Sequence, residues 1–126
     1  MIPQKSVIVK EFPTLLDSME GRRFYRELRR ELAELYRPQV VFDFSRVQHM
    51  TAQGVDLLVR CIDQIAERDG ELKFAAASPQ TQLVFELTQI NAVAETYDSV
   101  EDAVESWSIP AGSPVRPEAE PVSQAA

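Results

Sequence analysis

The feature that most constrains the fold is an apolar run at residues 40–44, followed after a polar loop by a segment with helical periodicity. The run is rich in β-branched and aromatic side chains, which predicts a buried strand. The later segment repeats apolar residues at spacings of three and four positions, which predicts one buried helix face. The expected core positions are Val55, Leu58, Val59, Ile62, Ile65 and Ala66. Such a strand–loop–helix unit is the building block of α/β folds with parallel sheets.

The alternation of strands and helices continues on both sides of this unit. Further strands are predicted at residues 6–10, 72–76 and 94–97, with residues 11–16 as a connection. Because helical segments separate the later strands along the chain, the sheet is expected to be largely parallel. We therefore predict an α/β domain over residues 1–107, with a mostly parallel sheet of about four strands and helices packed against it.

Capping residues mark where the other helices begin and end. Asp17, Ser78 and Ser99 carry side-chain oxygens that can accept a backbone N–H in the first turn of a helix. Pro38 is expected to end the first helix, and Gly70 to end the central helix in the left-handed conformation. The expected core faces are Phe24, Leu28, Leu32 and Leu35, then Leu83, Leu87 and Ile90, and last Val100, Val104 and Trp107.

From residue 108 the composition changes to Pro, Ala and Glu, without apolar periodicity. Pro110, Pro114, Pro117 and Pro121 exclude a continuous helix. We predict a disordered tail at residues 108–126, because such a segment has too few apolar side chains to bury.

The overall composition excludes several classes of function. The chain has one cysteine, Cys61, and one histidine, so it cannot form an intramolecular disulfide or a common zinc site by itself. The cysteine count favours a reducing compartment, and we predict a cytoplasmic protein. No apolar run approaches the ~20 residues of a membrane span, and the N-terminus lacks an apolar signal-peptide core. The formal charge of −7 argues against nucleic acid as the partner.

A group of arginines is the local exception to this acidic balance. Its members are Arg22, Arg23, Arg26, Arg29 and Arg30, which alternate with glutamates. Oppositely charged residues at helical spacing pair across the solvent face of a helix. The pattern therefore favours a salt-bridged surface over an anion-binding patch.

The residue types of common active sites occur here without the spacing that those sites need. His49 lies near Ser45 and Asp43, but the chain lacks the nucleophile elbow of hydrolases and the glycine-rich loops that bind nucleotides. Cys61 lies within the predicted central helix, which favours a small buried side chain over a reactive thiol. We predict no catalytic, cofactor-binding or metal-binding residue, and a protein that is not an enzyme.

Asp43, at the end of the predicted central strand, invites comparison with the phosphate acceptor of receiver domains. Those domains also need an acidic pair after the first strand and a lysine after a late strand. Here only Glu11 follows the first strand, and Lys73 lies within a strand. The pattern favours a structural role in which Asp43 accepts hydrogen bonds from amides of the adjacent loop.

The turn before the central helix is the clearest candidate site. Thr51 is predicted to cap this helix, a use that is favoured over phosphate acceptance at the positive helix end. Ala52 and Gln53 have no hydroxyl, so neither can be O-phosphorylated, and Gln53 also has no charge. Gly54 is expected in the first helical turn, where valine costs only ~1 kcal/mol of stability and mainly obstructs a docked partner.

Taken together, these stretches resemble a STAS domain, the fold of anti-sigma factor antagonists, over about residues 38–107. The resemblance rests on residues 40–47, 50–55, 68–72 and 77–90. At the family's junction an Asp is followed by a phosphorylatable Ser or Thr, a small residue and Gly. Thr51, Ala52, Gln53 and Gly54 occupy those positions here. Upstream, the chain is expected to depart from the family pattern, with one N-terminal strand where many members have two.

The resemblance implies a non-enzymatic bacterial signalling domain without a cofactor. Its partner would be an anti-sigma factor or a serine kinase of that type, with self-association as a further option. In regulated members phosphorylation ends binding, and Ala52 implies a permanently active antagonist in transcription regulation. The alternative is a scaffold STAS subunit of a stressosome-type assembly or of an ABC lipid transporter. The implied partner-binding residues are Asp43, Ser45, Met50, Thr51, Ala52, Gln53 and Gly54.

Overall fold

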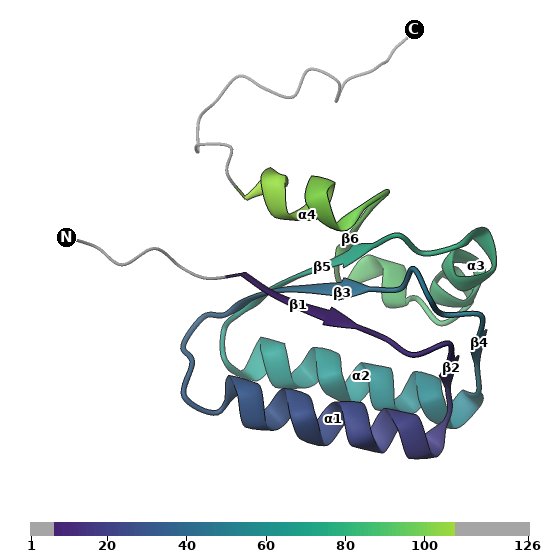
Figure 1. The fold of residues 1–126 in the computed structure, drawn as a ribbon, viewed down its shortest axis with the longest axis horizontal. Coiled ribbons are helices and arrows are strands. Elements are labelled where there is room, and N and C mark those ends of the chain that lie inside the picture. Colours follow the sequence, from purple (N-terminus) through teal and green to yellow (C-terminus); the bar gives the residue numbers. More distant parts are fainter. Residues whose placement is uncertain (1–6, 108–126) are drawn as a thin grey trace, which may run out of the picture.

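The computed structural model describes residues 7–107, so the tail predicted at residues 108–126 lies outside the described residues. Strands and helices alternate along the chain (Figure 1). In order, they are β1 (Val7–Glu11), β2 (Leu15–Leu16), α1 (Ser18–Leu32), β3 (Gln39–Asp43), β4 (His49–Met50), α2 (Ala52–Glu67), β5 (Glu71–Ala75), α3 (Pro79–Leu87), the 3-10 helix η1 (Ile90–Ala92), β6 (Glu95–Tyr97) and α4 (Val100–Ser106). The predicted α/β class is confirmed.

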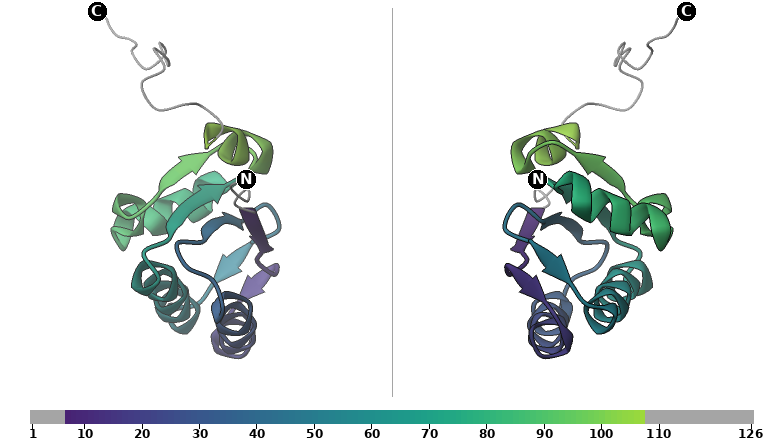
Figure 2. Two further views of the ribbon diagram at one scale, coloured as in Figure 1. Left: turned by 90° about the vertical axis from the view of Figure 1, so that its left-hand side faces the viewer. Right: turned by 90° about the vertical axis from the view of Figure 1, so that its right-hand side faces the viewer.

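The main sheet has four strands in the order β1-β3-β5-β6, and every neighbouring pair is parallel. Each connection steps in the same direction across the sheet. Because parallel crossovers are right-handed, such a path puts α1, α2 and α3 on one face. Figure 2 shows α1 and α2 side by side beneath the sheet and α4 on its opposite side.

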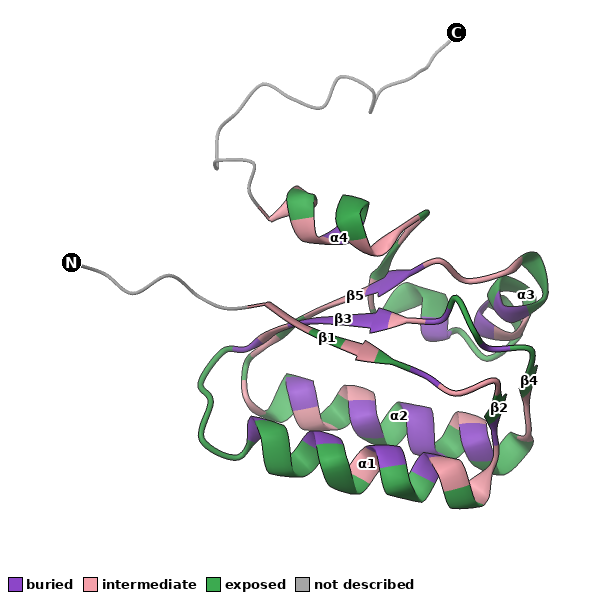
Figure 3. Cartoon of the chain, viewed as in Figure 1, coloured by how far each residue is buried: buried purple, intermediate pink, exposed green. Residues whose placement is uncertain are grey.

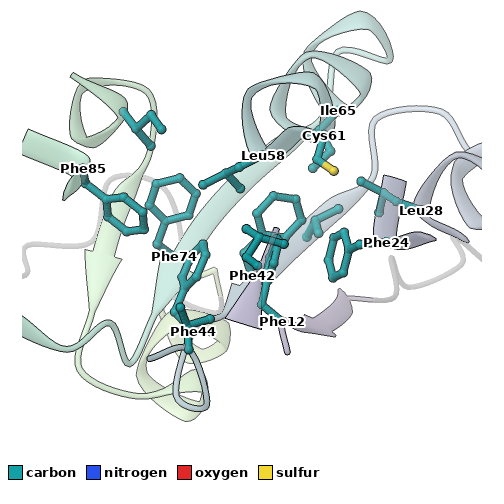
Figure 4. Close-up of a cluster of buried hydrophobic side chains, with 14 of the residues drawn as sticks. Phe12, Phe24, Leu28, Phe42, Phe44, Leu58, Cys61, Ile65, Phe74 and Phe85 are labelled. Carbon is teal, nitrogen blue, oxygen red and sulfur yellow. The ribbon is translucent and has the colours of Figure 1, made fainter. Parts of the chain in front are cut away.

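The main core lies between the sheet and the first three helices. All six phenylalanines of the chain are buried there, as Figure 4 shows. Phe12 stacks on Phe24 with ring centroids 3.9 Å apart, and Phe85 meets Phe44 and Phe74 at 5.0 and 5.1 Å. On the other face, Val100, Val104 and Trp107 pack over a small cluster of Val41, Ala75 and Ala103, as predicted for α4.

The N-terminal connection differs from the prediction. Residues 11–16 were expected to lack secondary structure, but Leu15 and Leu16 form β2, which pairs in parallel with β4. The expectation of one N-terminal strand is therefore wrong. Both strands have only two residues, and so short a pairing has no alternating apolar pattern that sequence reasoning could detect.

The buried faces of α1 and α2 differ from the prediction (Figure 3). Leu35 is exposed because α1 ends at Leu32. On α2, Val59 and Ala66 are exposed, whereas Leu57 and Cys61 are buried beside the expected Leu58 and Ile65. The helix is thus rotated about its axis relative to the prediction, because α1 as well as the sheet packs against it.

The largest error concerns α3. Leu83 and Leu87 were predicted in the core, but they are 53% and 76% exposed, and Phe85 is buried instead. Ile90 is buried as predicted, but it follows Gln89, whose φ of 63° is left-handed. This break means that the spacing from Leu83 to Ile90 does not describe one continuous helix face.

The three predicted N-caps are confirmed, whereas the ends of α1 and α2 differ from the prediction. Helix α1 ends at Leu32, well before Pro38, which was expected to end it. Asp17, Ser78 and Ser99 accept hydrogen bonds from first-turn amides. Asp69, with φ of 58°, is the left-handed residue after α2, not Gly70 as predicted. Gly70 is needed for space, because a Cβ there would lie 2.7 Å from the Pro38 carbonyl oxygen.

Candidate functional site

The candidate site is the end of the molecule where α1 and α2 begin. β2 leads into α1 and β4 leads into α2, so the β2–β4 pair holds the two helix starts side by side (Figure 1). The Thr51 amide also donates to the Leu16 carbonyl oxygen at 3.0 Å. The local structure around the junction is therefore fixed by backbone pairing.

Thr51 is the N-cap of α2, as predicted. Its Oγ1 accepts a hydrogen bond from the Gly54 amide at 3.0 Å. Ala52 and Gln53 are the first two helical residues, and both are exposed. Met50 is half-buried against the main core. The junction thus presents two exposed side chains on a well-anchored helix start.

Gly54 lies in the first turn of α2, as predicted, but its role differs from the prediction. It is buried, and a Cβ at this position would lie 2.0 Å from the Leu16 carbonyl oxygen. A backbone atom cannot move away as a flexible side chain can. The expected cost of only ~1 kcal/mol for valine is therefore wrong, since it counted helix propensity alone.

Asp43 and Ser45 form a separate feature at the end of β3. Asp43 Oδ1 accepts a hydrogen bond from the Ser45 amide at 2.9 Å, which is the structural role predicted for this carboxylate. Ser45 is exposed and Asp43 half-buried. Among the described residues, no hydrogen bond joins this turn to the residues of the α2 start.

Two apolar side chains near the junction were not predicted. Leu15 is 42% exposed and Met19 65% exposed, and they line a shallow hollow together with Pro13 and Arg46. Leu15 belongs to β2 and Met19 to the first turn of α1. They stand out only because the short β2 strand and the helix start bring them to the surface, which no local pattern indicates.

The predicted salt-bridged surface on α1 is formed only in small part. Arg23 pairs with Glu20 within the helix, and Glu31 pairs with Lys10 of β1. Across residues 7–107, no carboxylate lies within ion-pair distance of Arg22 or Arg26. These two arginines line a groove between α1 and α2.

A wider hollow than the two near the helix starts lies elsewhere, along β5, β6 and the residue after α4. There Lys73 Nζ lies 4.3 Å from the Trp107 ring centroid and 5.2 Å from that of Tyr97. It also donates a hydrogen bond to Ser106 Oγ. Burial lowers the pKa of Lys73. These contacts hold α4 against the sheet, which gives the lysine a structural role.

Within residues 7–107 no cluster of His, Cys, Asp and Glu has the arrangement of a metal site. None of the described helices combines the length and apolar character that crossing a bilayer requires. Cys61 is buried, and burial raises the pKa of its thiol to about 12.

The sequence profile of the STAS domain family matches residues 4–103. No curated protein sequence matches the chain.

Several solved structures share the fold. An anti-sigma-factor antagonist (STAS) domain protein from Planctomyces limnophilus has a TM-score of 0.70 and 22% identity, covering 79% of this chain and 89% of that one. The STAS domain of a SulP transporter from Vibrio cholerae has a TM-score of 0.69 and 13% identity, covering 85% and 84%. Phosphorylated SpoIIAA of Bacillus has a TM-score of 0.65 and 15% identity, covering 85% and 96%.

Proposed function

The chain belongs to the STAS domain family, and we propose that it acts in cytoplasmic signalling by binding an anti-sigma factor or a related kinase. STAS domains are generally regulatory and interaction domains without enzymatic activity. The structures that share this fold include anti-sigma factor antagonists and the STAS domains of sulfate transporters. The Bacillus antagonist SpoIIAA has been solved in phosphorylated and unphosphorylated forms.

The observation that carries this proposal is the exposed and rigid start of α2. Ala52 and Gln53 project from a helix turn that the Thr51 cap and the β2–β4 pair hold in place. Leu15 and Met19 add exposed apolar area nearby. A preorganised surface loses little entropy when a partner docks.

We also propose that phosphorylation does not switch this surface at the usual position. A phosphate is well accommodated at a helix N-terminus, but its charge obstructs a partner docked there. Ala52 cannot accept a phosphate, and the Thr51 hydroxyl serves as the helix cap. Binding would then be governed by the amount of protein and not by its phosphorylation state.

The experiment restores a switch with the substitutions Thr51→Asp and Ala52→Ser. Asp is as good a cap as Thr, and Ala52 is exposed, so folding should be preserved at a cost of at most about 1 kcal/mol. After incubation with a STAS-directed anti-sigma factor kinase, intact-mass analysis should find one phosphate on the double variant and none on residues 51–54 of the parent. Phosphorylation should weaken the binding of the kinase, measured by calorimetry.

The single variant Thr51→Asp is the matched control, because it carries the acidic residue without the acceptor hydroxyl. Phosphate on Thr51 of the parent would contradict the proposal that phosphorylation does not switch this surface. If the kinase binds neither the parent nor the folded double variant, the antagonist function is wrong.

A scaffold subunit of a larger assembly is the second candidate function. It is favoured by the apolar side chains of Leu83, Leu87 and Val93, which are 53%, 76% and 55% exposed on α3 and after η1. Exposed apolar residues of this size often mark contacts between proteins. Co-purification separates the two candidates, because the scaffold function requires a large homologous assembly or an ATPase subunit, whereas the antagonist function requires a kinase-like partner.

A further inference from the structure

A groove of about 340 Å³ runs between the first halves of α1 and α2. Its lining residues are Ser18, Arg22, Tyr25, Arg26, Gln53, Asp56, Leu57 and Arg60. Gln53 belongs both to this groove and to the exposed start of α2. The groove is therefore continuous with the surface that we propose for partner binding.

Close packing of the two helices forms the floor of the groove. Gly21 of α1 lies so near Leu57 of α2 that a Cβ at Gly21 would be 2.7 Å from Leu57 Cδ1. Tyr25 forms part of the wall, and its hydroxyl accepts a hydrogen bond from Gln64 Nε2 at 3.2 Å. The Arg29 guanidinium lies 5.8 Å from the Tyr25 ring centroid on the same helix. Close helix packing and a side-chain hydrogen bond therefore hold the groove in shape.

The groove is basic on a protein whose net charge is −7. Arg22 and Arg26 are one helical turn apart on α1, and Arg60 faces them from α2. Asp56 is the single acidic residue of the lining. Within residues 7–107 none of these three arginines forms an ion pair. Both helices also begin at this end, so their positive dipole ends add to the arginine charges.

We propose that this groove binds a carboxylate-bearing segment of the protein partner, an inference that rests on the proposed antagonist function. A guanidinium group binds a carboxylate through two parallel hydrogen bonds, and three unpaired guanidinium groups offer several such sites. Carboxylates are the proposed occupant because the partner in the proposed function is a protein, whose anionic side chains are carboxylates, and because the groove adjoins the surface proposed for that partner.

The test uses a deca-glutamate peptide as the probe and follows the backbone and arginine Nε–H signals of the ¹⁵N-labelled protein by NMR. The peptide should shift the signals of Arg22, Arg26, Gln53 and Arg60, and the shifts should weaken with added salt. Arg22→Glu with Arg26→Glu should reduce affinity at least tenfold. Asp56→Asn should raise affinity about two- to fivefold, an increase that general loss of structure cannot produce.

The matched control is Arg23→Glu with Arg30→Glu, which changes the net charge of α1 by the same amount outside the groove. It should retain most of the affinity for the peptide. An equal loss of peptide affinity in both double variants would contradict the inference, since such a loss would reflect net charge alone. Stronger binding of inorganic phosphate than of the peptide at the same signals would also overturn it and assign the groove to phosphate groups.

Failure of this inference is distinguishable from failure of the proposed function. If an anti-sigma factor kinase binds the parent and the Arg22→Glu/Arg26→Glu variant equally well, the groove is not the carboxylate site but the antagonist function stands. If the kinase does not bind the parent at all, the antagonist function fails, and the peptide titration still reports whether the groove binds carboxylates.

Discussion

At the scale of single residues, Gly54 determines how closely α2 can approach β2. The Leu16 carbonyl oxygen occupies the space that a side chain at Gly54 would need. Because Gly54 has no Cβ, the start of α2 can lie against the β2–β4 pair, so the residue acts on the site through the backbone. Exposed Ala52 and Gln53 carry no such constraint.

We expect Gly54→Ala to lower the free energy of unfolding by about 2 kcal/mol, and Gly54→Val to lower it further. The reason is the 2.0 Å distance between the added Cβ and the Leu16 carbonyl oxygen. Urea denaturation followed by circular dichroism measures the change. Gln53→Ala, one residue away and exposed, should stay within about 0.5 kcal/mol of the parent. A Gly54→Ala variant as stable as Gln53→Ala would contradict the close approach.

Cys61 supplies a second prediction at this scale, because burial raises the pKa of its thiol from 9.0 to about 12. Above pH 9 the unfolded chain loses the thiol proton while the folded chain keeps it. The contribution of this group to stability is therefore fully present below pH 9 and is lost as the pH rises toward 12.

The measurement compares the parent with Cys61→Ala, which removes the titrating group. The difference in unfolding free energy between them should be constant at neutral pH and shrink above pH 9. In the native protein the thiol should react with a thiol reagent only on unfolding. Rapid reaction of the native protein at neutral pH would show that Cys61 is accessible.

At the scale of elements, α3 shows how tertiary packing selects a helix face. Its sequence contains Leu83, Leu87 and Phe85, and either face could have been buried. Phe85 is the residue that reaches Phe44 and Phe74 at the end of the sheet. The helix has nine residues and ends before the left-handed Gln89, so no longer pattern decides between the faces.

We therefore expect opposite results from two substitutions on this helix. Phe85→Ala should cost about 3–5 kcal/mol, since it leaves a cavity beside two aromatic rings. Leu87→Ala should change stability by less than about 0.5 kcal/mol, because the side chain is 76% exposed. Thermal and urea unfolding of both variants provide the comparison, and a larger effect for Leu87 would mean that another molecule covers this face in solution.

At the scale of the whole molecule, the order of the strands places three helices on one face of the sheet and only the short helix α4 on the other. α1, α2 and α3 cover the first face, and α4 covers Val41 and Ala75 on the second through Ala103. Trp107, just after α4, stacks near Lys73 of β5. We therefore expect that a stable domain has to extend through Trp107.

We propose that residues 108–126 contribute little to this stability. Truncation after Trp107 should shift Tm by no more than about 4 °C, which corresponds to less than about 1 kcal/mol. Truncation before Ser99 is the contrasting variant and should lower Tm far more, because it removes α4 and exposes Val41 and Ala75. Differential scanning calorimetry of the three chains tests this, and a large loss of Tm on truncation after Trp107 would contradict it.

The sequence by itself determined the features that depend on neighbouring residues. Thr51 caps α2 because its hydroxyl reaches an amide three residues away. The apolar run at residues 40–44 forms a strand in the middle of the sheet because its side chains favour burial in a strand. These interactions are local, so the sequence pattern alone predicts the fold class and the start of the central helix.

Only the tertiary structure decided which atoms meet across long stretches of chain. Leu16 meets Gly54, Gly21 meets Leu57, and Arg60 faces Arg22 because α1 and α2 pack in parallel on one face of the sheet. Such contacts depend on the rotation of each helix about its axis and on a two-residue strand pair. Packing between distant segments sets the helix rotations and the strand pairing. The apolar periodicity within one segment carries no information about that packing.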